Sequence, residues 1–130
     1  MERVCRVLVV EDNHDIRDLL ADVFDHEGYR FTLASNGAEM RGALAGGDID
    51  VVIIDVVLPG ESGLALAKEA ADRGCGVILV TGHHDHFETV YKSGHRYAFK
   101  PYRLKSLLAL VDEALREAKA RCRVKDRRYG

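Results

Sequence analysis

Short apolar runs alternate along this chain with stretches in which apolar residues recur at a helical spacing. The runs at 7–10, 51–54 and 77–80 are rich in β-branched residues and show little polar alternation, which predicts strands buried on both faces. Two weaker strands are expected at 30–34 and 96–99. Because strands that alternate with helices form parallel sheets, the pattern predicts an α/β fold, a doubly wound (βα)5 arrangement with a five-stranded sheet.

The intervening helices are indicated by apolar stripes and by residues typical of helix ends. Asn13 or Asp15 can cap the first helix, which Gly28 can end. Ser62 can cap a third helix that runs to residue 73. The other expected helices cover residues 37–45, a short segment at 87–93 and a long final stripe from 104 to 118.

Composition narrows the class of protein. A chain of 130 residues has the size of one domain, and 47% apolar with 31% charged residues suits a globular protein. Residues 119–130 carry six basic residues and one acidic residue, so the net charge of −2 leaves residues 1–118 distinctly acidic. We therefore expect one domain over 1–118, a solvated basic tail over 119–130, and no direct binding of nucleic acid.

Neither targeting signals nor cysteine patterns stand out. No apolar run reaches the length needed to cross a bilayer, and the N-terminus lacks the features of a signal peptide, which predicts a cytoplasmic protein that does not contact the membrane. The three cysteines, Cys5, Cys75 and Cys122, lack metal-type spacing, and an odd number fits poorly with a disulfide framework. We expect them to be small buried or edge residues.

Polar residues stand where the predicted strands end. Glu11 and Asp12 follow the first strand, and Asp55 ends the third. Thr81 ends the fourth strand, and Lys100 follows the fifth. Because open α/β sheets bind ligands outside the carboxyl ends of their strands, we expect three carboxylates, a hydroxyl and an ammonium to converge there.

Such a set of side chains predicts phosphoryl chemistry. Close carboxylates repel, and hard oxygen ligands from few protein groups favour Mg²⁺ as the cation that relieves the repulsion. Asp55 would be the nucleophile, with Lys100 as a point charge for a phosphoryl oxygen and Thr81 as a hydrogen-bond donor. A strand-end aspartate that merely caps a helix is the simpler alternative, but it leaves the other strand-end residues unexplained.

Four segments resemble one known family when they are taken in this order. They are RVLVVEDN at 6–13, VVIIDVVLPGESG at 51–63, VILVTGH at 77–83 and YAFKPY at 97–102. Together they are similar to the receiver domain of two-component response regulators, over residues 4 to about 118. The resemblance implies a chemotaxis-regulator-like fold with the flavodoxin-like strand order 2-1-3-4-5, acting as a signalling switch rather than an enzyme.

The resemblance also implies a role for each acidic residue. Asp55 would be phosphorylated by a histidine kinase or a histidine phosphotransferase. Asp12 would bind Mg²⁺ directly, and Glu11 would act mostly through water. The backbone carbonyl of Val57 would be a further ligand of the metal.

A conformational switch is implied by the same family. Thr81 and Lys100 would contact the phosphoryl group, and Tyr97 would turn inward when Thr81 moves. The Lys100–Pro101 peptide bond would be cis. Phosphorylation would remodel the face of the fourth helix, last strand and last helix for protein–protein contact, and the family allows a homodimer through the last strand and last helix.

Three features depart from the pattern of the family. The interval between the ends of the fourth and fifth strands is about three residues short, which predicts a shortened fourth helix. Val57 and His83 occupy positions that tune the lifetime of the phosphoryl group in the family. His83, His84 and His86 lie together in one loop, where solvated residues or an influence on dephosphorylation is favoured over a transition-metal site.

Other functions were weighed against the same residues. A phosphohydrolase with an aspartate nucleophile usually carries a second acid two positions later, where this chain has Val57. A flavin-binding domain would need a phosphate-binding loop after the first strand, where Glu11 and Asp12 would repel a phosphate. A single-domain effector, a phosphorelay shuttle and an excised receiver of a larger DNA-binding regulator all remain compatible with the sequence.

Overall fold

A parallel five-stranded sheet forms the centre of the molecule. The computed structural model describes residues 6–129, except for the side chains of 84 and 121–129. The strand order is β2-β1-β3-β6-β7 and every pairing in this sheet is parallel, which confirms the predicted order 2-1-3-4-5. The strands are β1 (Arg6–Val10), β2 (Arg30–Ala34), β3 (Val51–Asp55), β6 (Gly76–Thr81) and β7 (Arg96–Phe99).

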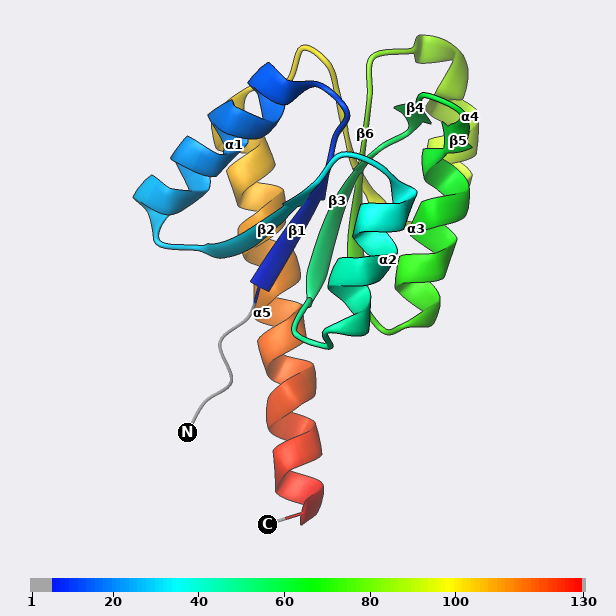
Figure 1. Ribbon diagram of the computed structural model, residues 1–130. Helices are drawn as coiled ribbons and strands as arrows, with labels where there is room; N and C mark the ends of the chain where they lie inside the picture. The colour runs from blue at the N-terminus through cyan, green and yellow to red at the C-terminus, as the bar shows by residue number, and fades with distance from the viewer. Residues whose placement is uncertain (1–5, 130) are drawn as a thin grey trace.

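Helices cover both faces of the sheet (Figure 1). The helices α1 and α5 pack on one face, while α2, α3 and α4 pack on the other. Their bounds are α1 (His14–Glu27), α2 (Gly37–Ala45), α3 (Gly63–Asp72), α4 (Phe87–Lys92) and α5 (Leu104–Tyr129).

Local sequence signals account for where the helices begin and end. Asn13 accepts a hydrogen bond from the backbone of Ile16, so it is Asn13 rather than Asp15 that caps α1. Gly28 ends α1 with a φ of 80°, a left-handed conformation that favours glycine. Ser62 caps α3 as the sequence predicts. The predicted helix boundaries therefore agree with the structure to within about one residue at these positions.

The two faces of the sheet bury separate cores. Alternate residues of β1 point to opposite sides, so Leu8 and Val10 join the core under α2 and α3, while Val7 and Val9 join the core under α1 and α5. All five residues of β3 are buried, because this strand is central and covered on both faces. Cores of this kind hold the strand ends, and hence their polar side chains, in a defined register.

Two features of the fold were not expected from the sequence, and a third was. A small hairpin of β4 (Val57–Leu58) and β5 (Glu61–Ser62) follows β3. The final helix was expected from 104 to 118, whereas α5 continues to Tyr129. The fourth helix has six residues and is preceded by the 3₁₀ turn η1 (His84–His86), which confirms the predicted shortening.

Three smaller expectations can be compared with the described residues. The Lys100–Pro101 bond is cis, as the resemblance implied. Cys75 is partly buried, with its sulfur 3.5 Å from the carbonyl oxygen of Ile49, whereas Cys5 and the side chain of Cys122 lie outside the described part. Within residues 6–129, no helix is both long enough and apolar enough to span a membrane.

Candidate functional site

The register of the sheet brings the strand-end residues together. Asp55 is the last residue of β3, and it is paired with Val80, next to Thr81 at the end of β6. Thr81 is in turn paired with Phe99, next to Lys100. Because β1 lies on the other side of β3, Glu11 enters the same edge from that direction. The register therefore brings these strand ends, and the residues that they carry, to one edge of the sheet.

Three carboxylates form a compact cluster at this edge. One oxygen from each of Glu11, Asp12 and Asp55 lies within 4.8 Å of the others. Glu11 and Asp55 are buried, with 5% and 6% of their surface exposed, while Asp12 is exposed. The cluster is therefore open to solvent on the Asp12 side and closed on the side of the sheet.

The electrostatics of this cluster favour a bound cation. The pKa of Glu11 is raised to about 7, first by burial and then by the hydrogen bond and negative charge of nearby Asp55, while the charge of Lys100 opposes the increase. A divalent cation would stabilise the ionised form of all three acids. Oxygen-only donors, one of them exposed to water, fit Mg²⁺, which keeps several of its own waters.

Asp55 is held at both carboxylate oxygens. Its Oδ1 accepts the backbone N–H of Val57 at 3.0 Å, and its Oδ2 accepts Lys100 Nζ at 2.8 Å. Lys100 Nζ also lies 3.7 Å from Glu11 Oε1. Burial alone would lower the pKa of Lys100, but the hydrogen bond and charge of Asp55, together with the charge of Glu11, outweigh it and raise the pKa. Lys100 is therefore a firmly charged ammonium between two acids.

Backbone contacts support the loops that carry the acids. Arg17 Nη1 donates to the carbonyl oxygens of Glu11 and Asp12, at 2.8 and 2.9 Å. Gly63 donates its N–H to the carbonyl of Val56 at 3.0 Å, so α3 begins directly against the strand end that bears Asp55. Neither role carries a signal in the sequence, since each depends on a contact that forms only in the folded loop.

The hairpin after Asp55 is tied to a neighbouring helix. Glu61 accepts the backbone N–H of Gly37 at 2.9 Å, at the first turn of α2. A carboxylate in this place also interacts favourably with the positive end of the helix dipole. This contact links the loop beside the acidic cluster to α2, and sequence spacing gave no indication of it.

Thr81 on β6 and Tyr97 on β7 lie on the opposite side of Asp55 from Glu11, which follows β1. Thr81 is fully buried, and its Oγ1 accepts the backbone N–H of His83 at 3.1 Å. Tyr97 is partly buried, with its ring centroid 5.6 Å from that of Phe99 and 6.5 Å from that of Phe87. Tyr97 therefore belongs to an aromatic group at the surface of α4 and β7.

Comparison with known proteins identifies the family. The model of the family described as "Response regulator receiver domain" matches residues 7–112. The chain belongs to this family. The match covers every strand-end residue described above, and it places the chain among signalling switches rather than classical enzymes.

Relatives of this receiver domain are found in several organisms. The transcriptional regulatory protein AruR of Pseudomonas aeruginosa is 32% identical over 128 residues, which cover 92% of this chain and 52% of the relative. The chain spans about half the length of curated relatives such as this one.

Solved structures agree with the fold. A CheY-like receiver domain protein from Methanospirillum hungatei is 25% identical and superposes with a TM-score of 0.81, covering 91% of this chain and 98% of that one. The response regulator TrrA of Thermotoga maritima, solved in complex with Mg²⁺ and BeF, is 31% identical with a TM-score of 0.76, covering 85% and 99%.

Two observations bear on the alternatives weighed on sequence. The position two residues after Asp55 carries a valine rather than the second acid of a phosphohydrolase, and this valine is 44% exposed. Among the described side chains, His83 and His86 join no third metal-ligating group, so the transition-metal interpretation gains no support.

Proposed function

We propose that Asp55 accepts a phosphoryl group from the phosphohistidine of a histidine kinase or histidine phosphotransferase. One observation carries the proposal: at the carboxyl edge of a parallel sheet, Glu11, Asp12 and Asp55 form an acidic cluster, and the Lys100 ammonium lies 2.8 Å from Asp55 Oδ2 and 3.7 Å from Glu11 Oε1. Mg²⁺ would be held by Asp12, Asp55 and the backbone carbonyl of Val57, with Glu11 acting mostly through water. The complex of TrrA with Mg²⁺ and BeF supports this ligand chemistry.

The transfer exchanges one bond to phosphorus for another. The P–N bond of the phosphohistidine breaks, and a bond forms between phosphorus and a carboxylate oxygen of Asp55, which becomes an acyl phosphate. The imidazole leaves with the electron pair of the broken bond and takes up a proton from solvent. Bound Mg²⁺ would supply positive charge to the transferring oxygens, where most of the catalysis of such transfers lies.

The chain's own residues have separate tasks in this step. The N–H of Val57 holds Asp55 Oδ1, which orients the carboxylate before the donor arrives. The ammonium of Lys100 would move from the free carboxylate to a phosphoryl oxygen. The hydroxyl of Thr81 would donate to another phosphoryl oxygen, since a hydroxyl carries one hydrogen for donation.

Transfer of the phosphoryl group to Asp55 would change the protein surface formed by α4, β7 and α5. Movement of Thr81 toward the phosphoryl group would allow Tyr97 to turn inward and remodel the face of α4, β7 and α5 for a protein partner or a second copy of the chain. The proposed receiver body is residues 1–118, with residues 119–130 as a basic extension. The relatives named as transcriptional regulators keep open the alternative that such a body serves a DNA-binding output domain.

Intact mass measurement tests the proposal. The protein is incubated with acetyl phosphate and Mg²⁺, and wild type is compared with Asp55→Ala. We expect one phosphoryl group to be added to wild type and none to the variant. Asp15→Ala is the matched control, because Asp15 is a fully exposed acid on α1 that should leave phosphorylation unchanged.

Two results would count against the proposal. A gain in mass that persists in Asp55→Ala would place the acceptor elsewhere. No gain in wild type, either with acetyl phosphate or with a panel of phosphorylated histidine phosphotransferases, would remove the phospho-acceptor role altogether.

A further inference from the structure

Two histidines contact the hydroxyl of Thr81. His83 donates its backbone N–H to Thr81 Oγ1 at 3.1 Å, and the Nδ1 atom of His86 lies 3.4 Å from the same oxygen. The two imidazole rings also lie against each other, with centroids 5.5 Å apart. Thr81 is thus covered by the loop that follows it.

The hydroxyl of Thr81 can donate only one hydrogen bond. The N–H of His83 occupies one of its lone pairs, so the hydrogen remains available for an acceptor, and His86 Nδ1 is the neighbouring side-chain atom that can take it. A phosphoryl oxygen on Asp55 would need the same hydrogen. We propose that His86 is a positioning residue that holds Thr81 in its resting arrangement by competing with the phosphoryl group for this hydrogen. The inference rests on the proposed phosphorylation of Asp55.

The shortened segment after β6 brings His86 to this position. Residues 84–86 form a single 3₁₀ turn, in which the N–H of His86 donates to the carbonyl of His83 at 3.1 Å. Helix α4 begins directly after the turn, at Phe87. His86, whose imidazole contacts Thr81, is therefore adjacent in sequence to Phe87, the first residue of α4. A displacement of His86 would move the start of α4 with it.

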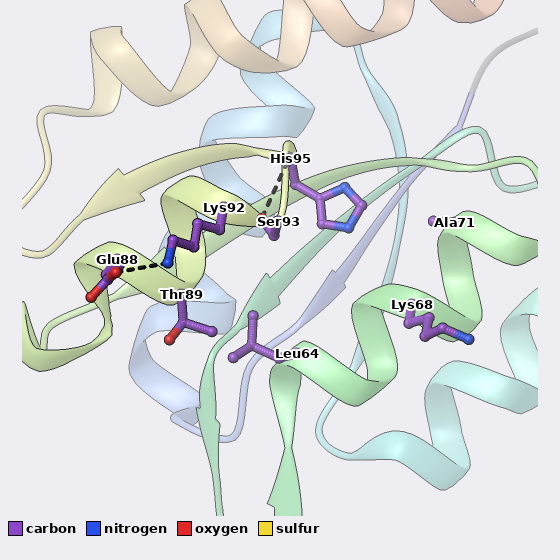
Figure 2. A pocket seen from close by; sticks show the side chains of 8 residues that line it. All are labelled: Leu64, Lys68, Ala71, Glu88, Thr89, Lys92, Ser93 and His95. Atoms are coloured by element: carbon purple, nitrogen blue, oxygen red, sulfur yellow. Dashed lines mark hydrogen bonds and ion pairs between the residues drawn. The ribbon is translucent and has the colours of Figure 1, made fainter.

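Helix α4 is suited to respond to such a displacement. Among its six residues only Val90 is buried. An open groove of about 770 Å³ separates α4 from α3 (Figure 2). The lysines of this groove are each paired within their own helix, Lys92 with Glu88 at 2.8 Å and Lys68 with Asp72 at 3.6 Å, so no ion pair between the lining residues ties the helices together.

Phe87 connects the 3₁₀ turn at residues 84–86 to the aromatic rings of Tyr97 and Phe99. Its ring stacks on Phe99 with centroids 5.8 Å apart and meets the edge of Tyr97 at 6.5 Å. Release of His86 from Thr81 would move Phe87, and with it the packing around Tyr97. The contact between His86 and Thr81 therefore sets how readily Tyr97, and with it the face of α4, β7 and α5, changes when Asp55 is phosphorylated.

Two variants at His86 separate the hydrogen bond from the bulk of the ring. His86→Phe keeps a ring of similar size but removes the acceptor, whereas His86→Asn places an amide oxygen near the position of Nδ1. Loss of one hydrogen bond changes an equilibrium by roughly two- to tenfold. We expect His86→Phe to bind beryllofluoride with Mg²⁺ roughly two- to tenfold more tightly than wild type, and His86→Asn to remain close to wild type.

The Tyr97 signal reports on the switch itself. In protein labelled with 3-fluorotyrosine, with the resonance assigned through Tyr97→Phe, His86→Phe should shift the ¹⁹F signal toward its beryllofluoride-bound position before any ligand is added. In the Thr81→Val background the same substitution should have no further effect, because no hydroxyl remains to be released. Thermal unfolding of each variant identifies any general loss of structure.

The protonation pattern of His86 is a second, independent readout. Long-range ¹H–¹⁵N spectra of the unmodified protein should show the hydrogen of the neutral ring on Nε2, leaving Nδ1 as the acceptor. A hydrogen on Nδ1 would overturn the proposal, since the ring would then donate to Thr81 and leave its hydroxyl hydrogen free. Equal behaviour of His86→Phe and His86→Asn would also overturn it.

These outcomes are distinct from failure of the proposed function. If Asp55 gains no phosphoryl group, the mass measurement shows it whatever the state of His86. If Asp55 is phosphorylated but the His86 variants respond identically, only the inference about His86 fails.

Discussion

Replacing Gly63 with alanine should be among the most damaging single-methyl changes in this protein. A Cβ at residue 63 would overlap the carbonyl oxygen of Asp55 and lie 2.6 Å from Val56 Cα and 2.8 Å from the Val56 oxygen. Ordinary contacts between such atoms are about 3.5–4.0 Å, so the strand end or the helix must shift by about 1 Å. All three opposing atoms belong to the backbone, which yields less readily than the end of a side chain.

The expected cost follows from this geometry. Overpacking of a tight interior costs about 1–3 kcal/mol, and backbone on every side places Gly63→Ala at about 3 kcal/mol or more. That is a large share of the total of about 5–15 kcal/mol for a domain. Because the displaced segment carries Asp55, phosphorylation by acetyl phosphate should slow as well.

Gly42→Ala is the matched control. Gly42 lies within α2, and a Cβ there would meet nothing within 4 Å. The better helix propensity of alanine should stabilise the protein by about 0.5–1 kcal/mol. Urea unfolding followed by circular dichroism measures both changes. A free energy of unfolding for Gly63→Ala within about 1 kcal/mol of wild type would refute the reasoning, as would an equal loss in Gly42→Ala.

Two further predictions concern the acidic cluster. The pKa of Glu11 is raised from 4.5 to about 7, so its protonated form is favoured in the fold, and its contribution to stability without metal is full below pH 4.5 and lost as the pH rises through 7. Since Mg²⁺ competes with that proton, the increase in melting temperature caused by Mg²⁺ should be larger at pH 8 than at pH 6. Glu11→Gln should remove this difference. An equal increase at both pH values in wild type would contradict the prediction. Lys100→Met removes the ammonium 2.8 Å from Asp55, so Mg²⁺ should bind more tightly by calorimetry, while the rate of phosphorylation falls by roughly 10–100-fold in an intact-mass time course. Unchanged values for both quantities would show that Lys100 is not electrostatically coupled to the cluster.

Sequence patterns predict most of this fold because the strands and helices follow local rules. Helix α2 begins and ends at the predicted residues 37 and 45, and Gly28 ends α1 in the left-handed conformation that only glycine adopts easily. The strand ends could be placed because buried parallel strands are continuous apolar runs. The convergence of the acids then follows from topology, without knowledge of any side-chain contact.

Contacts that depend on loop geometry could not be predicted in this way. The hairpin of β4 and β5 has two residues in each strand, which is too short for a periodic pattern. The hydrogen bond from Gly37 to Glu61 joins positions 24 residues apart, and the contact of His86 with Thr81 requires a 3₁₀ turn that charge and hydropathy do not indicate. The final helix was expected to end at residue 118, where its apolar stripe ends, whereas α5 continues to Tyr129.

Asp55 and helix α4 lie in parts of the molecule that differ in rigidity. Asp55 ends a strand whose five residues are all buried, whereas α4 has one buried residue and faces an open groove. Amide hydrogens of β3 should therefore exchange with solvent only on global unfolding, and those of α4 through small local openings. Phosphorylation of Asp55 would thus modify the rigid central strand, while the response would occur in the more mobile helix α4. Thr81 lies between these two parts of the protein.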